Sequence, residues 1–328
     1  MTNNQSLLKN NFPDIDWFFA KPLAELSYFK LGGLAEVYCK VSEFKILKEI
    51  LIFCEEKNIP WTIVGGMSNV VIDDEGINGL VLQMACKDFQ VLSDEDQALT
   101  FKAEAGIKTS QLVSKASNLG GTGLEGFIGV PGTLGGAIYN NAHYLDSLIG
   151  DYIVNVQAFH VKNNEEITIS HENCQFAYEH SIFQNDKQWV ILAATFSLSK
   201  DNSESIKKRL IEAQSRRQAT QPLKLPSSGC IFQNPRNTDY LKKLFPQFAN
   251  NEFIPAGFLI DQAGLKNSQV GAIMVSDQHA AFLVNVSEQV QLPAYSADVK
   301  KLIKKIQSAV KAEFRVELKE EIFYLSNK

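Results

Sequence analysis

The sequence predicts a mixed fold of α-helices and β-strands, divided over two or three domains. Helical and strand-like hydrophobic patterns alternate along the chain, which is typical of proteins that mix the two elements. Its 328 residues correspond to about two domains at roughly 150 residues each. Hydrophobic residues make up 45% of the chain, while its 20 Gly and 10 Pro are far below the share that marks disorder. We therefore expect an ordinary globular protein with a sizeable core.

A helix capped by Ser42 is the first element that we justify from the pattern. Its apolar residues recur at the spacing of one helix face: Leu47, Ile50, Leu51 and Cys54. Residues 60–64 then predict a strand, which two glycines interrupt and which resumes at 70–72. A turn rich in Asp and Gly follows at 73–76.

The middle of the chain combines a second helix with a long glycine-rich stretch. The helix is expected over 109–119, where two glycines stop it. Residues 120–136 are dense in glycine and proline among short apolar residues, which predicts bent backbone in close contact with something rather than a regular element. Strands are expected at 154–161, 166–169 and 189–198.

Two helices and a short strand are expected in the remainder of the chain. A polar helix over 203–217 marks the start of a further domain. The helix expected over 296–314 buries one apolar face, formed by Leu302, Ile303, Ile306 and Val310. A short strand over 322–325 follows it.

Composition excludes several classes of protein. The 32 Lys and Arg against 37 Asp and Glu give a net charge of −5, which argues against a dedicated binder of nucleic acid or anionic membranes. The apolar runs are far shorter than the roughly 20 residues of a membrane span, and residues 1–19 lack the pattern of a signal peptide. The five widely spaced cysteines form no Cys-x-x-Cys and fit the reducing cytoplasm better than a disulfide framework.

Two glycine-rich runs are candidate cofactor loops. The first, 64–69, lies between two predicted strands, and its backbone amides with the side chains of Ser68 and Asn69 suit a diphosphate. A tight turn closed by a side-chain hydrogen bond explains this run equally well. The second, 126–136, is longer than a turn requires and too apolar for a mobile surface loop. Backbone that lies flat against a large planar cofactor would explain it.

Two further patterns are weak. Gly121-x-Gly123-x-x-Gly126, with Asp146 20 residues beyond, matches a dinucleotide-binding fingerprint. That fingerprint needs a strand before it and a helix after it, and this one follows a helix, so a Rossmann site is not expected. His171, Cys174 and His180 fit no standard zinc spacing, and we expect them to be ordinary surface or core residues.

Cys230 and Glu321 are candidate acid–base residues. Cys230 lies in a turn-rich segment just after a glycine. A cysteine is most often a small core residue, but with an ordinary pKa of about 8.5 its thiol is protonated at neutral pH and can donate a proton. Glu321 directly precedes a predicted apolar strand, which can hold its carboxyl in a fixed place, although acidic tails are usually solvated.

Taken in order, these segments resemble the UDP-N-acetylenolpyruvoylglucosamine reductases, the MurB family of peptidoglycan synthesis. The resemblance extends from about Lys21 to Tyr324. It rests on the motifs at Pro22–Gly33, Gly65–Asn69, Gly123–Ala137, Gln221–Pro222, Ser227–Pro235, Pro255–Lys266 and Val275–Asn285. The uninterrupted passage from 261 to 285 is similar to the shorter form of the family.

The resemblance implies an α+β fold in three parts. An FAD-binding domain of the vanillyl-alcohol-oxidase (PCMH) type would comprise two subdomains, residues 1–75 and 76–202. A substrate-binding α+β domain would cover 203–328, with its final strand packing back towards the flavin. Gly65, Gly66, Met67, Ser68 and Asn69 would then contact the FAD diphosphate, and Pro131, Gly132, Thr133, Gly135 and Gly136 the flavin side.

The implied reaction reduces UDP-N-acetylglucosamine enolpyruvate to UDP-N-acetylmuramate. Hydride passes from the co-substrate NADPH through FAD to C3 of the enolpyruvyl group, and a general acid protonates C2. The family's proton donor, usually Ser, corresponds to Cys230, and its catalytic Glu corresponds to Glu321. Tyr178, Asn234 and His279 fall at expected substrate contacts. A monomer that binds these two small molecules, with no nucleic acid, membrane insertion or metal, is expected.

Three departures from the family pattern matter, and the first two are losses of positive charge at the site. Glu179 stands at the position of the family's active-site Arg, and Gln233 at that of a Lys. An anion beside developing negative charge has the wrong sign for catalysis, so a Lys or a distant Arg must reach in, or Glu179 must point away. The third departure is a shortened segment, Asn141-Ala-His-Tyr144. These losses leave two alternatives open, namely a flavoenzyme with another substrate and a non-catalytic homologue that binds flavin or a nucleotide sugar.

Overall fold

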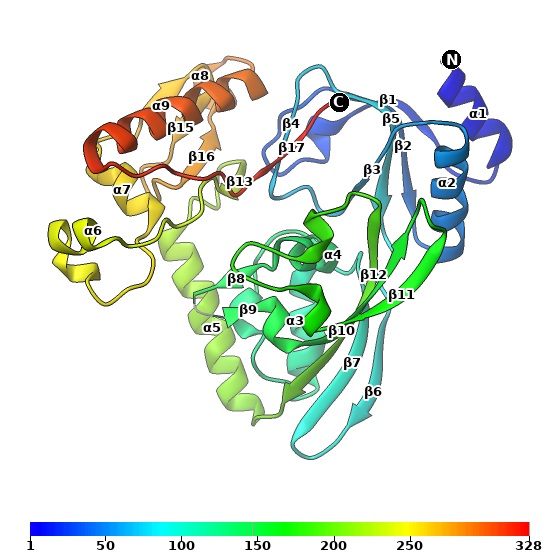
Figure 1. Ribbon diagram of the computed structural model, residues 1–328, viewed down its shortest axis with the longest axis horizontal. Coiled ribbons are helices and arrows are strands. Elements are labelled where there is room, and N and C mark those ends of the chain that lie inside the picture. The colour runs from blue at the N-terminus through cyan, green and yellow to red at the C-terminus, as the bar shows by residue number, and fades with distance from the viewer. Residues whose placement is uncertain (146, 328) are drawn as a thin grey trace. The chain divides into compact units, whose positions relative to one another are not determined.

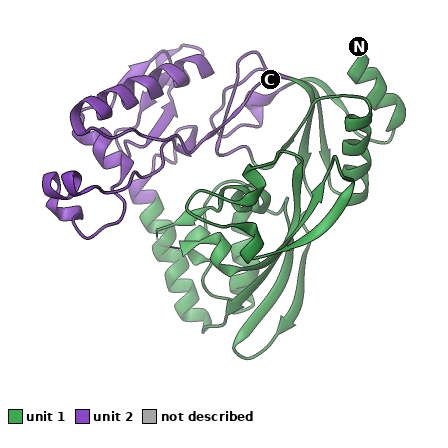
Figure 2. Cartoon of the chain, in the orientation of Figure 1, with its two compact units in different colours: residues 1–21, 35–66, 78–217 green, residues 22–34, 67–77, 218–328 purple. Residues whose placement is uncertain are grey.

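The computed structural model describes residues 1–145 and 147–327 (Figure 1). Its contacts divide the chain into two compact units, which Figure 2 distinguishes by colour. Unit 1 comprises residues 1–21, 35–66 and 78–217, and unit 2 comprises 22–34, 67–77 and 218–328. Two short N-terminal segments therefore belong with the C-terminal third of the chain. No helix in the described ranges is both long enough and apolar enough to cross a membrane.

Unit 1 contains a five-stranded antiparallel sheet in the order β11-β10-β12-β7-β6. The strands are β6 (Phe89–Asp94), β7 (Ala98–Glu104), β10 (Ile153–His160), β11 (Glu165–Ser170) and β12 (Trp189–Ser199). The three strands expected between residues 154 and 198 are confirmed with small shifts at their ends. The helices α3 (Thr109–Asn118) and α4 (Leu134–Asn140) belong to the same unit, and α4 contacts both β7 and β12.

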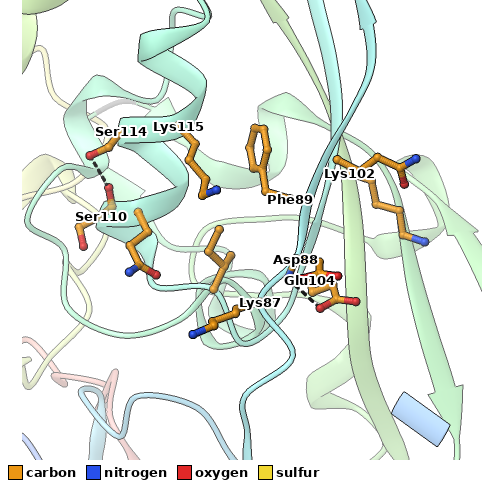
Figure 3. Close-up of a pocket in the computed structure, with 11 residues that line it drawn as sticks. Lys87, Asp88, Phe89, Lys102, Glu104, Ser110, Ser114 and Lys115 are labelled. Carbon is orange, nitrogen blue, oxygen red and sulfur yellow. Dashed lines mark hydrogen bonds between the residues drawn. The ribbon is translucent and has the colours of Figure 1, made fainter. Parts of the chain in front are cut away.

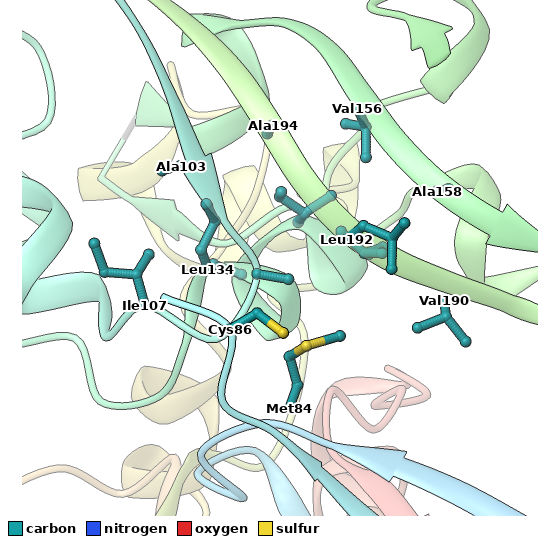
Figure 4. Close-up of a cluster of buried hydrophobic side chains, with 14 of the residues drawn as sticks. Met84, Cys86, Ala103, Ile107, Leu134, Val156, Ala158, Val190, Leu192 and Ala194 are labelled. Atoms are coloured by element: carbon teal, nitrogen blue, oxygen red, sulfur yellow. The ribbon is translucent and has the colours of Figure 1, made fainter. Parts of the chain in front are cut away.

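Small side chains on this sheet allow α4 to approach closely. Ala103 pairs with Ala194 across β7 and β12, and Ala194 pairs with Val156 on β10, so the three residues form one row on one face. Figure 4 shows this row in the buried cluster that also contains Leu134. α4 thus begins inside the glycine-rich stretch. The expectation that residues 120–136 form no regular element was wrong for its last three residues.

The first part of the chain forms a second sheet in the order β1-β2-β5-β3. Its strands are β1 (Phe18–Pro22), β2 (Leu34–Val41), β3 (Trp61–Val64) and β5 (Ile77–Met84), with β3 parallel to β5. The helix α2 (Phe44–Glu56) buries the four apolar residues expected of it. The predicted cap was wrong, because Glu43 occupies the N-cap and its side chain makes no capping hydrogen bond.

Unit 2 is built on a four-stranded antiparallel sheet in the order β13-β16-β15-β14. The strands are β13 (Ser227–Cys230), β14 (Gln269–Val270), β15 (Ile273–Val275) and β16 (Phe282–Asn285). The helix α9 (Ser296–Phe314) packs on β14, β15 and α7 (Ala256–Gln262), and its four predicted core residues are buried. The predicted bounds of α9 are confirmed, because its apolar face and its packing surface coincide.

The final strand returns to an early segment of the chain. β17 (Phe323–Leu325) pairs in parallel with β4 (Val70–Ile72), and the two lie side by side near the end marked C in Figure 1. Val71 is completely buried in the core of unit 2. In the turn after β4, the Asp74 carboxylate accepts a hydrogen bond from the Ser296 backbone amide at 2.8 Å. These contacts explain why residues 67–77 belong to unit 2.

The other elements are short, apart from α5. The helices are α1 (Asn3–Asn11), α5 (Ser203–Thr220), α6 (Asp239–Leu244) and α8 (Ser287–Val290), and the two-residue strands are β8 (His143–Tyr144) and β9 (Ser147–Leu148). The 3-10 turns are η1 (Leu23–Glu25), η2 (Glu125–Phe127), η3 (Ile149–Tyr152), η4 (Glu172–Cys174), η5 (Ile182–Gln184) and η6 (Pro246–Phe248). Residues 203–217 of α5 belong to unit 1, and its last three residues belong to unit 2. The functional division at residues 75 and 202 stays a prediction.

Candidate functional site

The two glycine-rich runs meet in unit 1. A Cβ atom on Gly66 would lie 2.6 Å from the Cα of Gly132, and one on Gly65 would lie 2.2 Å from Thr133 Oγ1. Real Cβ atoms essentially never approach this closely, so the backbones can touch only because these residues are glycines. The structure therefore brings together residues that the sequence assigned separately to a diphosphate loop and a flavin loop.

Backbone hydrogen bonds fix the second run against the segment that connects β7 to α3. The Leu134 amide donates to Ile107 O at 2.9 Å, and the Gly135 amide donates to Ala105 O at 2.8 Å. Thr133 occupies the N-cap of α4 but makes no side-chain capping bond. Its Oγ1 is buried and has no hydrogen-bond partner within 1–145 and 147–327. Since a buried hydroxyl normally has a partner, this atom is available to a ligand.

An ionic network holds the start of the second run to α5. Glu125 Oε1 accepts hydrogen bonds from Arg209 Nε at 2.9 Å and from the Thr122 hydroxyl at 2.8 Å. Its Oε2 accepts from the Gly123 amide at 2.6 Å. Burial alone would raise the pKa of the Glu125 carboxyl, but these hydrogen bonds outweigh burial and lower the pKa. Glu125 is therefore a charged anchor of the run.

In unit 2, Asn69 and Glu321 lie together although 252 residues separate them. Asn69 Nδ2 donates to the Glu321 carbonyl at 3.4 Å, and the Phe323 amide donates to the Asn69 carbonyl at 3.1 Å. The Glu321 amide in turn donates to Ile231 O at 2.8 Å. Because Ile231 directly follows Cys230, the backbone of Asn69, Glu321 and Cys230, three predicted site residues, lies in one region of unit 2.

Cys230 differs from the other cysteines in its exposure. Among the five cysteines, all within the described residues, Cys230 is the one whose side chain is not buried. In each of the other four, burial raises the thiol pKa to about 12: Cys39, Cys54, Cys86 and Cys174. Gly229 before it has a φ of 82°, in the region that favours glycine, and the β13–β16 register shifts there. Such an irregularity interrupts the regular alternation of side chains along a strand, in agreement with the partial exposure of Cys230.

Asn234 and His279 both lie at the first turn of α7. Asn234 Oδ1 accepts from the Ala256 amide at 2.9 Å. A Cβ on Gly257 would lie 3.2 Å from His279 Cε1. Burial lowers the pKa of His279, and its Nδ1 accepts from the Ala281 amide at 3.3 Å. A neutral His279 therefore carries its proton on Nε2.

Glu179 is buried in unit 1, where it has an imidazole as its partner. Its carboxylate accepts a hydrogen bond from Asn140 Nδ2 and lies 2.5 Å from His143 Nδ1. The Tyr178 ring lies 5.2 Å from the His143 ring. Glu179 has a φ of 53°, which is unfavourable for a residue with a side chain. The shortened segment and the Glu substitution, two separate departures in the sequence, thus meet in one cluster.

The sequence-based reasoning missed three polar residues of this region. Asn140 and His143 hold Glu179, and Arg217 lies over the Tyr144 ring with 5.7 Å from Cζ to the ring centroid. A Cβ on Gly129 would lie 3.4 Å from Arg217 Cδ, so this Arg also adjoins the second glycine-rich run. The position of His143 in the shortened segment was the signal available in the sequence, but spacing alone could not identify its partner.

The two weak patterns of the sequence, the His/Cys group and the run from Gly121, do not form sites in the described residues. His171 Nδ1 lies 3.1 Å from the Ile153 carbonyl, and Cys174 is buried. In the described ranges, no three His, Cys, Asp or Glu side chains group closely enough to hold a metal ion. The run that begins at Gly121 follows the helix α3, and Asp146 lies outside the described residues.

A pocket of about 930 Å³ lies in unit 1 between β6, β7 and α3. Figure 3 shows the residues that line it. Its lining contains side chains of both charges, among them Lys102, Lys115 and Glu104. Lys115 Nζ lies 5.5 Å from the centroid of the Phe89 ring, another part of the lining. No predicted catalytic, cofactor-binding or substrate-binding residue lines this pocket.

Comparisons with known proteins agree with this arrangement. The family profile of the FAD binding domain matches residues 35–167, and that of the UDP-N-acetylenolpyruvoylglucosamine reductase C-terminal domain matches 221–325. The curated reductase of this name from Caldanaerobacter subterraneus is 32% identical over 95% of this chain and 94% of its own. That from Chlamydia felis is 34% identical over 92% and 91%.

A solved structure resembles the whole chain. The crystal structure of UDP-N-acetylenolpyruvylglucosamine reductase (MurB) from Thermus caldophilus superposes with a TM-score of 0.71 at 26% identity. The match covers 95% of this chain and 99% of that chain. The predicted fold class, an FAD-binding domain of the PCMH type followed by an α+β domain, is confirmed.

The residues of unit 1 fit FAD, the cofactor of such a domain. The matched range 35–167 contains both glycine-rich runs, and the buried Thr133 Oγ1 offers a hydroxyl where they meet. FAD has the phosphate and ring acceptors that amides and hydroxyls of this kind bind. Since relatives more than 30% identical match over nearly all of both chains, the protein belongs to the UDP-N-acetylenolpyruvoylglucosamine reductase family.

Proposed function

We propose that the chain catalyses the NADPH-dependent reduction of UDP-N-acetylglucosamine enolpyruvate to UDP-N-acetylmuramate, a step of peptidoglycan biosynthesis. FAD, when bound, would accept hydride from NADPH and pass it to C3 of the enolpyruvyl group. One observation carries the proposal for this chain. The backbone bond from Glu321 to Ile231 places Glu321 beside the segment of Cys230, the accessible thiol among five described cysteines.

Cys230 is the proposed proton donor of the reaction. When hydride reaches C3, negative charge develops at C2 and on the adjacent carboxylate, and a proton must arrive at C2 to complete the product. The Cys230 thiol would give its Sγ proton to C2 and later recover one from solvent. The other four thiols are buried, so they cannot take this role without a rearrangement of the core.

Glu321 is proposed to position that proton donor. Its amide and carbonyl are both hydrogen-bonded, to Ile231 and Asn69, so its Cα is held on both sides. A carboxyl that starts from a fixed backbone loses little further freedom when it orients a neighbouring group. Asn234 and His279, both at the first turn of α7, and Tyr178 are proposed substrate contacts.

Cofactor contacts are proposed for the two glycine-rich runs. Gly65, Gly66, Met67, Ser68 and Asn69 would hold the diphosphate, and Pro131, Gly132, Thr133, Gly135 and Gly136 would lie along the flavin. The contact between the runs supports a single binding surface in unit 1 for Gly65, Gly66, Gly132 and Thr133. We further propose that the protein works as a monomer in the reducing cytoplasm, a compartment that preserves thiols.

Anaerobic reduction followed by addition of substrate tests the proposal. The flavin-loaded protein is reduced with NADPH, UDP-N-acetylglucosamine enolpyruvate is added, and flavin absorbance is followed. Rapid return of the oxidised spectrum, with UDP-N-acetylmuramate as the product, is the expected result. Reduction without reoxidation would instead indicate a flavoenzyme with another acceptor, an alternative that Glu179 and Gln233 favour. No reduction by NADPH would contradict the proposal and favour a non-catalytic homologue.

A further inference from the structure

Glu179 is a buried carboxylate whose charge needs compensation. Its side chain is 1% exposed. Within 1–145 and 147–327, its side-chain hydrogen-bond partners are Asn140 and His143, and the cluster contains no Lys or Arg paired with it. An isolated carboxylate at this depth would be strongly unfavourable. The imidazole of His143 is the group paired with Glu179 that carries a positive charge in its protonated form.

The geometry of His143 leaves one nitrogen available. Nδ1 lies 2.5 Å from Glu179 Oε1, and the side chain is 25% exposed. In the described part of the chain, Nε2 has no hydrogen-bond partner. A carboxylate that accepts a hydrogen bond from one imidazole nitrogen orients the ring. The other nitrogen is an N–H donor when the ring is protonated and an acceptor when it is neutral. Nε2 of His143 is therefore held in one direction and, with the ring charged, offers an N–H group to an anion.

This pair is attached to the second glycine-rich run at two places. Asn140, which binds Glu179, ends α4, the helix that begins at Leu134 within that run. Tyr144, the neighbour of His143, packs against Gly126, where a Cβ would lie 2.2 Å from its Cδ1. Glu179 and His143 are thus both connected to the segment that contains the proposed flavin contacts.

The surrounding charges favour an anion only when His143 is protonated. Tyr178 faces the imidazole ring, and His180 follows Glu179 in the chain. Arg217 lies over the neighbouring Tyr144 ring. Counting Glu179, His143 and Arg217, these described residues have a total charge of +1 with imidazolium and zero with neutral imidazole.

We propose that His143, oriented by Glu179, supplies the positive charge that binds the carboxylate of the enolpyruvyl substrate. This inference rests on the proposed function. Under this inference, Glu179 is a positioning residue that orients the His143 cation. It is not an anion that repels the substrate carboxylate.

Equilibrium binding to the flavin-loaded, oxidised protein tests the inference without turnover. The probes are UDP-N-acetylmuramate, which has the carboxylate, and UDP-N-acetylglucosamine, which lacks it. His143→Gln should weaken binding of the first by roughly ten- to hundredfold, as expected for loss of a charged hydrogen bond, and leave binding of the second unchanged.

Two further variants separate a charge effect from a structural one. His143→Lys keeps a cation, so it should retain tight binding of UDP-N-acetylmuramate. Glu179→Gln should weaken binding of UDP-N-acetylmuramate and leave binding of UDP-N-acetylglucosamine unchanged, because the imidazole loses the carboxylate that orients it. FAD content and thermal unfolding of each variant check the fold.

His160→Gln is the matched control. His160 also pairs with a carboxylate in unit 1, through Nε2 and Asp186 Oδ2 at 3.1 Å, but it belongs to β10 and not to the hairpin on the glycine-rich run. It should bind both probes like the wild type. Wild-type affinity for UDP-N-acetylmuramate in His143→Gln would overturn this inference and leave the proposed function standing. A wild type that neither prefers UDP-N-acetylmuramate nor reoxidises with the enolpyruvyl substrate would overturn the proposed function as well.

Discussion

Arg209 Nε donates to Glu125 Oε1 at 2.9 Å and joins α5 to the start of the second glycine-rich run. The Glu125 side chain is 5% exposed and that of Arg209 is 40% exposed. The pair therefore combines a buried carboxylate with a guanidinium that water still reaches. Removal of the Arg would leave the buried carboxylate without its charged partner. We therefore expect the pair to fix the position of the run and its loss to be destabilising.

Arg209→Met should destabilise the protein by about 1–3 kcal/mol, the cost of a buried charged group that loses hydrogen bonds, reduced by the exposure of the Arg. Glu125→Gln should cost less, because an amide replaces the charge. Urea unfolding at neutral pH measures both free energies. Lys208→Met, at an exposed position on the same helix, is the control, and an equal loss there would contradict the assigned role of Arg209.

The same pair predicts a dependence of stability on pH. The pKa of Glu125 is lowered in the folded protein from an ordinary value of 4.5. A lowered pKa contributes stability that is present above pH 4.5 and is lost as pH falls through the folded value. Wild type and Glu125→Gln should therefore differ in free energy of unfolding at pH 7 and converge in acid. A constant difference down to acid unfolding would exclude an ionised Glu125 as the cause.

Gly66→Ala should abolish FAD retention and lower the unfolding temperature, because its Cβ would lie 2.6 Å from the Gly132 Cα. The absorbance of flavin that co-purifies with the protein measures the effect. Gly136→Ala is the control for the fold alone, because Gly136 is itself a proposed flavin contact; the nearest atom to its Cβ would be Thr133 Oγ1 at 4.0 Å. That change adds a better helix former, so the fold should persist. Normal FAD content in Gly66→Ala would show that the runs need not touch.

Cys230→Ala should leave reduction of FAD by NADPH intact and slow reoxidation by the enolpyruvyl substrate by roughly a hundredfold or more, as expected for loss of a general acid. Cys230→Ser keeps a hydroxyl donor and should retain part of the second half-reaction. Rapid-mixing absorbance measures each half separately. Cys174→Ala, at a buried thiol, should lower stability without a selective effect on either half. Equal slowing of both halves in Cys230→Ala would remove Cys230 from the proposed role.

Asp74→Ala should destabilise unit 2 by about 1 kcal/mol, the usual cost of a lost helix cap. The N-cap residue of α9, Tyr295, makes no side-chain capping bond, and the Asp74 carboxylate instead accepts from the Ser296 amide. Hydrogen exchange of the first α9 amides should increase in this variant. Asp96→Asn, at an exposed loop position, should have no such effect, and an unchanged α9 in Asp74→Ala would mean that other contacts hold the helix.

Local patterns predicted the elements whose burial repeats at a regular period. α9 was found from residue 296 to 314 because its apolar face is regular along its whole length. α4 was missed because glycine usually ends helices, whereas here a Cβ on Gly135 would lie 3.0 Å from the Ala105 Cβ, so a side chain has little room at this position of the helix. Ser42 was the better cap by residue type, yet the chain begins its helix one residue later.

The candidate site was predictable as motifs but not as an arrangement. Both glycine-rich runs stand out in the sequence because glycine is unusually dense there. Cys230 stands out because it follows a glycine in a turn-rich segment. Asn69 and Glu321 could not be paired from spacing, since 252 residues separate them. The partnership of Glu179 with His143 likewise depends on the path of two loops, which hydrophobic periodicity does not encode.

The parallel pair of β4 and β17 has a consequence for the order in which the protein matures in the cell. During synthesis, residues 70–72 leave the ribosome long before residues 323–325 exist, so β4 has no partner while most of the chain is still being translated. The hydrogen bond from Asn69 to the Glu321 carbonyl likewise cannot form until the end of the chain has been synthesised. Late, long-range closure of this kind is slow, and a nascent chain stalled before residue 323 would expose an unpaired apolar strand to chaperones and proteases.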